Sequence, residues 1–232
     1  MSRASALTPL AEDIWVAERP QSFYGLPVGT RMTVMRLSGG RLLLHSPVAL
    51  DAQLKAELDA IGRVTYTVAP NRVHHLYAGD VAKVYPDARL WVGPGLERKR
   101  PDLKFVAILD DEAPEEWREE VGQTYFRGRP YENEIVFFHR ASRTLILCDL
   151  AFNIGPSAAA LTRFLMKLIG SYGRFGPSKL DPLLIRDRPA ARRSLERILA
   201  WDFDRVIVAH GDIVENGGRE SLRAGYAWLL SR

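Results

Sequence analysis

The sequence predicts an α/β protein with two strand-rich halves, each covered by helices. Two observations carry this prediction. Apolar runs of strand length alternate with helical segments, which is the rhythm of βαβ units. Hydrophobic residues make up 47% and charged residues 26% of the chain, close to the average of soluble globular proteins. The 232 residues fit one large domain, residues 1–232, whose two halves share a core.

The first half opens with strands. Residues 14–17 form a short apolar run, and residues 32–37 and 41–45 flank a hairpin signal at residues 38–40. Asp51 can cap a helix that Gly62 ends. The elements expected after it are a buried strand at residues 64–68, a helix at about 73–85, strands at 90–92 and 104–109, and an acidic loop with a short helix at 110–120.

The second half again mixes strands with helices. Residues 170–177 are rich in glycine, so we expect a mobile loop there that can close over a nearby site. The other expected elements are strands at residues 123–126, 134–138, 144–147 and 205–209, and helices at 157–169, 188–201 and about 219–230.

Candidate metal ligands follow several of these strands. The chain has five histidines, and His74, His75 and His210 lie where a predicted strand ends or the next helix begins. Asp149 follows a strand in the same manner. The carboxyl ends of strands in α/β sheets gather ligands, and imidazole and carboxylate groups suit zinc, iron or manganese.

Two questions stay open at this point. Adjacent residues on a helix point about 100° apart, so one of His74 and His75 can ligate while the other orients a partner, unless a turn lets both reach. The alternative to a metal site is that His74 and His210 are polar groups satisfied within the fold.

The order of these parts resembles the metallo-β-lactamase superfamily over roughly residues 14–230. That family's pattern is His-x-His-x-Asp-His after a strand, a mid-chain Gly-His, a strand ending in Gly-Asp or Ser-Asp, and a final strand ending in Gly-His. Here residues 67–75, residues 127–130, Asp149 and His210 occupy those four places in order. The resemblance implies an αββα sandwich, with two mixed β-sheets flanked by helices.

The departures from the family pattern define the expected site. Pro70 and Arg72 fall on the first two histidines of the motif, and Arg129 falls on the mid-chain histidine, so the ligands of the first metal are absent. The remaining residues map onto the second-metal position. The resemblance therefore implies one divalent metal ion, with His74, His75, Asp149 and His210 as its ligands. Zinc is expected first, and iron or manganese are the alternatives. If the site is degenerate, no metal binds.

A narrower resemblance concerns short motifs. The chain is similar to an uncharacterised branch of the superfamily, a domain of unknown function. The motifs that carry this similarity are Met32 to Val34, His45 to Pro47, Pro70-Asn71 with His74-His75, Phe137 to His139, and Asp149-Leu150.

The expected function is a metal-dependent hydrolase of a small ester, thioester or phosphoester. Asp149 would hold the metal, and Arg72 or Arg129 would bind an anionic substrate group and stabilise developing negative charge. An equally weighted alternative makes both arginines structural, in ion pairs with Glu132 or Glu134. Two other functions stay open, a non-catalytic protein that binds a ligand or partner and a metal protein with redox or oxygen chemistry.

Charge, hydropathy and cysteine content restrict the classes of partner and the compartment that the sequence predicts. The net charge of +4 is modest and no basic, aromatic-rich motif accompanies it, so nucleic acid is not expected and a small anionic molecule is. No apolar run is long enough for a membrane span. The single cysteine, Cys148, excludes an internal disulfide and favours the cytoplasm.

The remaining polar residues are expected to have structural roles, namely His45, His139 and Cys148, whereas Asn71 is expected to be a turn residue or an oxyanion donor. The sequence leaves the oligomeric state open.

Overall fold

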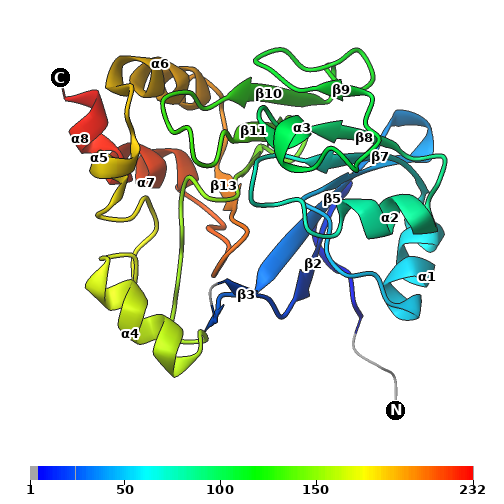
Figure 1. Ribbon diagram of the computed structural model, residues 1–232, viewed down its shortest axis with the longest axis horizontal. Coiled ribbons are helices and arrows are strands. Elements are labelled where there is room, and N and C mark those ends of the chain that lie inside the picture. Colours follow the sequence, from blue (N-terminus) through cyan, green and yellow to red (C-terminus); the bar gives the residue numbers. More distant parts are fainter. Residues whose placement is uncertain (1–4, 24, 232) are drawn as a thin grey trace.

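The computed structural model describes residues 5–23 and 25–231, and these residues form two packed β-sheets with helices outside them (Figure 1). The first sheet has the strand order β1-β2-β5-β6-β7-β8-β9, with the bounds Thr8–Ala11, Ile14–Arg19, Thr30–Leu37, Arg41–His45, Arg63–Ala69, Arg89–Val92 and Ala107–Ile108. The second has the order β10-β11-β12-β13, with the bounds Val121–Tyr125, Ile135–His139, Thr144–Ile146 and Arg205–Ile207. A separate hairpin pairs β3 (Ser22–Phe23) with β4 (Leu26–Pro27).

Both sheets are mixed. Strands β1, β2, β5 and β6 pair antiparallel, whereas β6 to β9 pair parallel. In the second sheet β10, β11 and β12 are antiparallel and β13 runs parallel to β12. Parallel neighbours end at the same edge of a sheet, so the segments after β6 and β7 lie together, as do those after β12 and β13.

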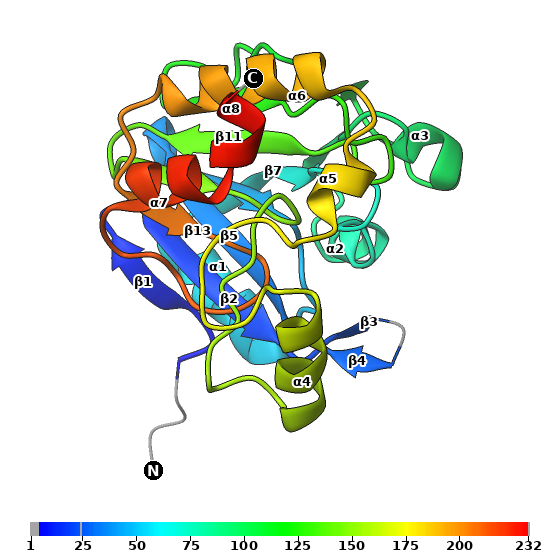
Figure 2. The same ribbon diagram turned by 90° about the vertical axis from the view of Figure 1, so that its left-hand side faces the viewer.

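Helices cover the outer face of each sheet (Figure 1). The first sheet is covered by α1 (Ala52–Ile61) and α2 (Ala78–Val84), and the short α3 (Leu96–Lys99) follows β8. The second is covered by α6 (Arg188–Leu199), α7 (Gly218–Gly225) and α8 (Ala227–Leu230). Two further helices are α4 (Ala160–Leu168) and α5 (Asp181–Leu184). Figure 2 shows α4 beside the β3–β4 hairpin, and the Thr162 hydroxyl donates to the Pro27 carbonyl, 2.5 Å away.

The inner faces of the two sheets share a hydrophobic core. Met35, Leu43 and Val68 from the first sheet belong to one buried cluster with Phe137 and Ile146 from the second. Strands buried on both faces read as nearly continuous apolar runs, and all five residues of β11 are buried. This shared core fixes the edge of one sheet against the edge of the other, which is where the candidate site lies.

The structure differs from the sequence predictions at several boundaries. The helix expected at residues 73–85 begins at Ala78, because the Asn71 side-chain oxygen accepts from the backbone N–H groups of Val73 and His74 and holds a turn there. The last expected helix is interrupted at Tyr226. The acidic segment at 110–120 is an irregular loop without the expected short helix. No helix among the described residues has the length and apolar character needed to cross a bilayer.

Candidate functional site

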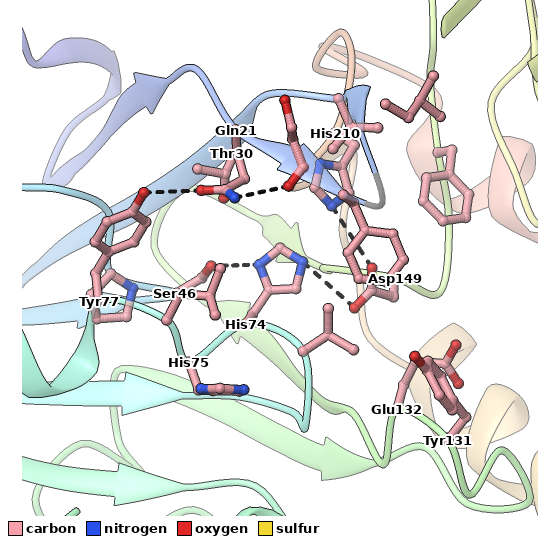
Figure 3. A pocket seen from close by; sticks show the side chains of 18 of the residues that line it. Gln21, Thr30, Ser46, His74, His75, Tyr77, Tyr131, Glu132, Asp149 and His210 are labelled. Atoms are coloured by element: carbon pink, nitrogen blue, oxygen red, sulfur yellow. Dashed lines mark hydrogen bonds and ion pairs between the residues drawn. The ribbon is translucent and has the colours of Figure 1, made fainter. Parts of the chain in front are cut away.

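Three of the predicted ligands meet where the two sheets adjoin. His74 lies in the turn after β7, Asp149 follows β12, and His210 follows β13. One ligand atom from each of these residues lies within 4.8 Å of the others (Figure 3). His74 Nε2 is 3.5 Å from one Asp149 oxygen, and His210 Nε2 is 3.8 Å from the other. The structure thus brings together two imidazoles and one carboxylate from distant parts of the chain.

The two imidazole rings are oriented by their other nitrogens. His210 Nδ1 lies 2.8 Å from the Gly29 carbonyl oxygen. A carbonyl only accepts, so Nδ1 carries the proton and Nε2 of the neutral ring has the lone pair. His74 Nδ1 lies 2.8 Å from the Ser46 hydroxyl, and its buried Nε2 has no hydrogen-bond partner. Histidines that ligate metals use one nitrogen for the metal and the other for such a contact.

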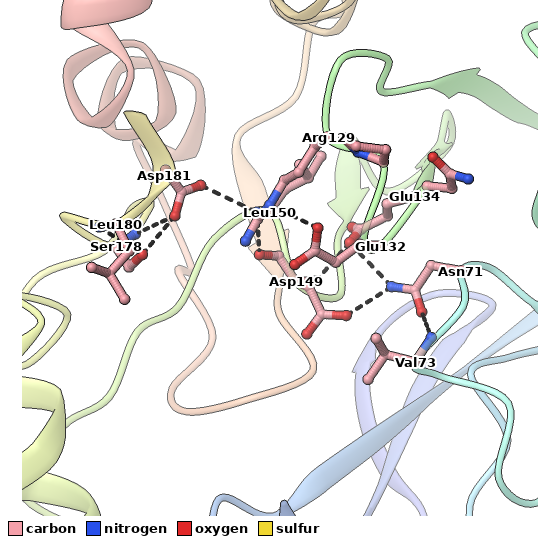
Figure 4. Close-up of polar contacts among 12 residues, drawn as sticks. Asn71, Val73, Arg129, Glu132, Glu134, Asp149, Leu150, Ser178, Leu180 and Asp181 are labelled. Atoms are coloured by element: carbon pink, nitrogen blue, oxygen red, sulfur yellow. Dashed lines mark hydrogen bonds and ion pairs between the residues drawn. The ribbon is translucent and has the colours of Figure 1, made fainter. Parts of the chain in front are cut away.

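A buried polar network holds Asp149 in place (Figure 4). The Asn71 side-chain amide donates to the Asp149 carboxylate at 2.8 Å. The backbone N–H groups of Cys148 and Asp149 donate to the Glu134 carboxylate, each at 2.7 Å. Arg129 donates to the Asp149 backbone carbonyl at 2.9 Å. These contacts fix both the backbone and the carboxylate of Asp149.

The protonation states follow from burial and from the charges within the site. Burial lowers the pKa of His210 to about 4, and the neighbouring His74 adds to this shift, so the ring is neutral at pH 7. Burial alone would lower the pKa of His74, but the Asp149 carboxylate outweighs it and raises that pKa. Burial opposes ionisation of Asp149, yet the nearby His74 holds its pKa below the usual value. The site therefore presents a carboxylate to its histidines.

His75 is not part of the group of converging ligand atoms. Its Nδ1 lies 3.1 Å from a guanidinium nitrogen of Arg100. Burial, together with the charges of Lys99 and Arg100, lowers the pKa of His75 to about 4. The geometry therefore does not meet the expectation that His75 ligates the metal. Its ring and that of His74 diverge from the turn, although His75 still lines the pocket described below.

The two arginines are also engaged elsewhere. Arg72 donates to the Pro130 carbonyl at 2.9 Å. Arg129 is buried and forms ion pairs with Glu132 at 3.0 Å and Asp181 at 3.1 Å (Figure 4). Neither residue is among those that line the pocket. Their positions do not support a direct contact with a substrate anion, and Arg129 shows the structural ion pair with Glu132 that was the alternative expectation.

A pocket of about 210 Å³ opens over the three converging residues (Figure 3). Its polar lining includes Ser46 and Glu132 besides His74, Asp149 and His210. The glycine-rich loop at residues 170–177 does not line it. Bridges join that loop to the chain around Phe152 and Ile154, and Met166 of α4 lines the pocket instead. The remaining wall is mostly apolar, with Phe23, Leu26, Val28, Pro47, Val73, Leu76, Tyr77, Tyr131 and Phe152 among its residues.

Several residues that build the site have roles that were not predicted from the sequence. Ser46 contacts His74 from a backbone with φ 56°, which is unusual for a residue other than glycine. The signal that could have found it is its place directly after β6, at the same sheet edge as the segment after β7. Glu134 and Asp181 were not identified in these roles, because their partners become neighbours only through the fold.

Comparisons with known proteins agree with the architecture. Residues 11–96 match the family described as Domain of unknown function (DUF4336). No curated protein sequence matches the chain. Among solved structures, DIM-1 metallo-β-lactamase exposed to ceftazidime is 13% identical, with a TM-score of 0.65, and the match covers 97% of this chain and 94% of that one.

Two further structures show the same likeness. FIM-1 from Pseudomonas aeruginosa in its mono-zinc form is 11% identical with a TM-score of 0.61, and the match covers 97% of this chain and 92% of that one. The Flv1 flavodiiron core from Synechocystis sp. PCC6803 is 13% identical with a TM-score of 0.67, over 96% of this chain and 60% of that one. This chain has the metallo-β-lactamase fold, and its N-terminal part matches a domain family of unknown function.

Proposed function

We infer that this protein is a metal-dependent hydrolase with a single metal ion held by His74, Asp149 and His210. The observation that carries the proposal is the orientation of the two rings, whose Nε2 atoms both face the Asp149 carboxylate. Three protein ligands, with a further position left for water or substrate, are typical of catalytic rather than structural zinc sites.

The residues fit such an ion in spacing and in chemistry. Ligand atoms about 2.1 Å from a tetrahedral ion are about 3.4 Å apart. The Nε2 atoms of His74 and His210 lie 3.5 and 3.8 Å from different oxygens of Asp149, and the three ligand atoms lie within 4.8 Å of one another, so small side-chain shifts would bring them to that spacing. His74 Nε2 is buried and makes no hydrogen bond, and its ion-pair partner, an Asp149 oxygen, lies 3.5 Å away, so an ion bound between the two atoms would satisfy both.

The chain's own residues would act by holding and orienting. When bound, such an ion supplies Lewis-acid polarisation and lowers the pKa of coordinated water. Ser46 and the Gly29 carbonyl hold the two rings, and Asn71 holds the carboxylate. The apolar wall of the pocket limits the access of bulk water, which strengthens electrostatic interactions at the centre.

Two alternatives rest on specific observations. Two histidines and one carboxylate also form the ligand set of non-haem iron sites, which favours redox or oxygen chemistry as the second candidate. A binding protein without metal is favoured by the absence of the family's first-metal histidines, because Arg129, which falls on one of them in the sequence, is held in buried ion pairs.

A hydrolase screen with matched variants tests the proposal. The purified chain, supplemented with zinc, iron or manganese, is assayed on panels of esters, thioesters and phosphoesters. We expect turnover of at least one panel with one metal, and we expect His210→Ala to reduce it to background. His139→Ala removes a histidine outside the site and should retain activity. Turnover that His210→Ala leaves unchanged would exclude this centre as its source.

A further inference from the structure

The pocket over the centre has walls that do not suit an anion. No lysine or arginine occurs among the described residues that line it. Two carboxylates do line it, those of Glu132 and Asp149. Where no metal ion is bound, an anionic ligand would therefore find these carboxylates and no lysine or arginine in the lining of the pocket.

Three guanidinium groups close to the pocket are held by other groups. Arg72 donates to the Pro130 carbonyl, and Arg129 is paired with Glu132 and Asp181. Arg100 lies 3.1 Å from His75 Nδ1 and pairs with Asp102 at 2.6 Å. Freeing any of these guanidinium groups to bind a ligand would break an existing contact, and for Arg129 it would leave buried carboxylates unpaired.

The apolar wall comes from three separate parts of the chain. The β3–β4 hairpin and the segment after it provide Leu26 and Val28, the turn after β7 provides Leu76, and α4 provides Met166. At the rim the side chain of Leu76 is exposed, with 54% of its surface accessible. Apolar side chains that converge around a few polar groups are typical of a small-molecule site.

We propose that the pocket binds a neutral, apolar group, such as a short acyl chain or an aromatic ring, next to the His74–Asp149–His210 centre. This inference rests on the proposed function and names its substrate class, in place of the small anionic molecule that the sequence suggested. An apolar cavity of about 150 Å³ is large enough for benzene. The pocket of about 210 Å³ therefore accepts a group of about six to nine non-hydrogen atoms.

Isothermal titration calorimetry with two matched ligand series tests the proposal. One series consists of straight-chain methyl ketones, which are neutral and cannot be hydrolysed, and the other consists of carboxylates of the same lengths. Both are measured on the full chain as purified and again with a chelator, so that binding through a metal ion is separated from binding by the walls. Ketone affinity should rise about fourfold per added methylene until the pocket is full. Carboxylates should bind at least about tenfold more weakly in chelator.

Three variants tie the binding to this pocket. Leu76→Asp adds a carboxylate at the exposed rim and should weaken ketone binding at least about fivefold. Leu183→Asp makes the same kind of change on α5, at an exposed residue that does not line the pocket, and should have no effect. Met166→Ala enlarges the pocket, so the chain length at which affinity levels off should increase by about two methylenes.

The outcomes separate this inference from the proposed function. Any of four results would overturn the apolar-ligand proposal. They are carboxylates that bind more tightly than ketones in chelator, a ketone affinity that does not depend on chain length, no binding of either series, and equal effects of the two aspartate variants. Metal content and turnover are measured independently of these titrations. Ketone binding by a chain that takes up no added metal and turns over no substrate would refute the hydrolase and leave the ligand class standing. Metal-dependent turnover without ketone binding would do the reverse.

Discussion

At the residue scale, His74 and His210 each give one ring nitrogen to the protein and turn the other toward Asp149. Ser46 is the only side-chain hydroxyl described in contact with either of these rings, and the Gly29 carbonyl orients the second ring. Groups that fix a ligating histidine in this way contribute to metal affinity without touching the metal.

Removing the Ser46 hydroxyl should therefore weaken metal binding. We expect Ser46→Ala to reduce affinity for a divalent ion about 10- to 100-fold, because His74 loses the contact that orients its ring. Competition against a chromophoric chelator measures this change. Ser142→Ala is the matched control, since Ser142 makes the same contact, at 2.7 Å, with His139 outside the site. Equal affinities of the two variants would contradict the role given to Ser46.

The sequence predicts some residues of the site better than others. His74, Asp149 and His210 could be found because each follows a strand, and strand ends gather at one edge of a sheet. The ion pair of Arg129 with Glu132 was one of two alternatives, but its pair with Asp181 could not be predicted, because Asp181 lies far along the chain and becomes a neighbour only in the fold. His75 could not be separated from His74 before the turn that carries them was known.

At the element scale, loops rather than helices place the three ligands. The Asn71 side chain holds the turn that carries His74, which is why helix α2 begins later than its apolar pattern predicts. His210 precedes Gly211, whose φ is 92°. A β-carbon built at Gly211 would lie 2.2 Å from the Asn153 carbonyl oxygen, so this close approach of two loops requires glycine.

Replacing Gly211 should therefore disturb the ligand beside it. We expect Gly211→Ala to weaken metal affinity and to destabilise the fold by more than the roughly 1–2 kcal/mol that a positive φ costs an alanine. Gly217→Ala is the control, because Gly217 also has a positive φ, 67°, but has open space around it. Chelator competition and urea unfolding measure the two effects. The same loss of affinity in both variants would show that the Asn153 contact does not position His210.

At the scale of the whole molecule, the two sheets meet through a shared core, and the order of the parts along the chain predicted this arrangement. Short edge elements were missed, namely β1 and the β3–β4 hairpin, because runs of two to four residues carry too little periodicity. That hairpin contributes Phe23 and Leu26 to the pocket, so the sequence predicted the position of the centre but not the character of its walls.

A buried histidine in this core should make stability depend on pH. His45 ends β6, and its ring packs against Phe137 of the second sheet with ring centroids 4.9 Å apart. Burial lowers its pKa to about 3, and the neighbouring His74 adds to the shift. Between about pH 3 and 6.5 the unfolded chain binds the proton and the folded chain does not. The contribution of this pKa difference to the free energy of unfolding is therefore complete above pH 6.5 and is lost as the pH falls.

Urea unfolding in chelator measures this dependence. The free energy of unfolding should fall as the pH is lowered from 6.5 toward 4. His45→Gln cannot titrate, so its slope should be smaller by about 1.4 kcal/mol per pH unit, whatever the variant's overall stability. Identical slopes in the two proteins would show that His45 does not carry this dependence.

The central claim is the metal centre, and metal content tests it most directly. Inductively coupled plasma mass spectrometry is applied to the chain purified without an affinity tag, to His74→Ala and His210→Ala, and to His139→Ala as the control. We expect about one zinc, iron or manganese ion per wild-type chain, retained in His139→Ala and lost in both site variants. A folded wild-type chain that contains no metal and takes up none when it is added would show that His74, Asp149 and His210 do not form a metal centre.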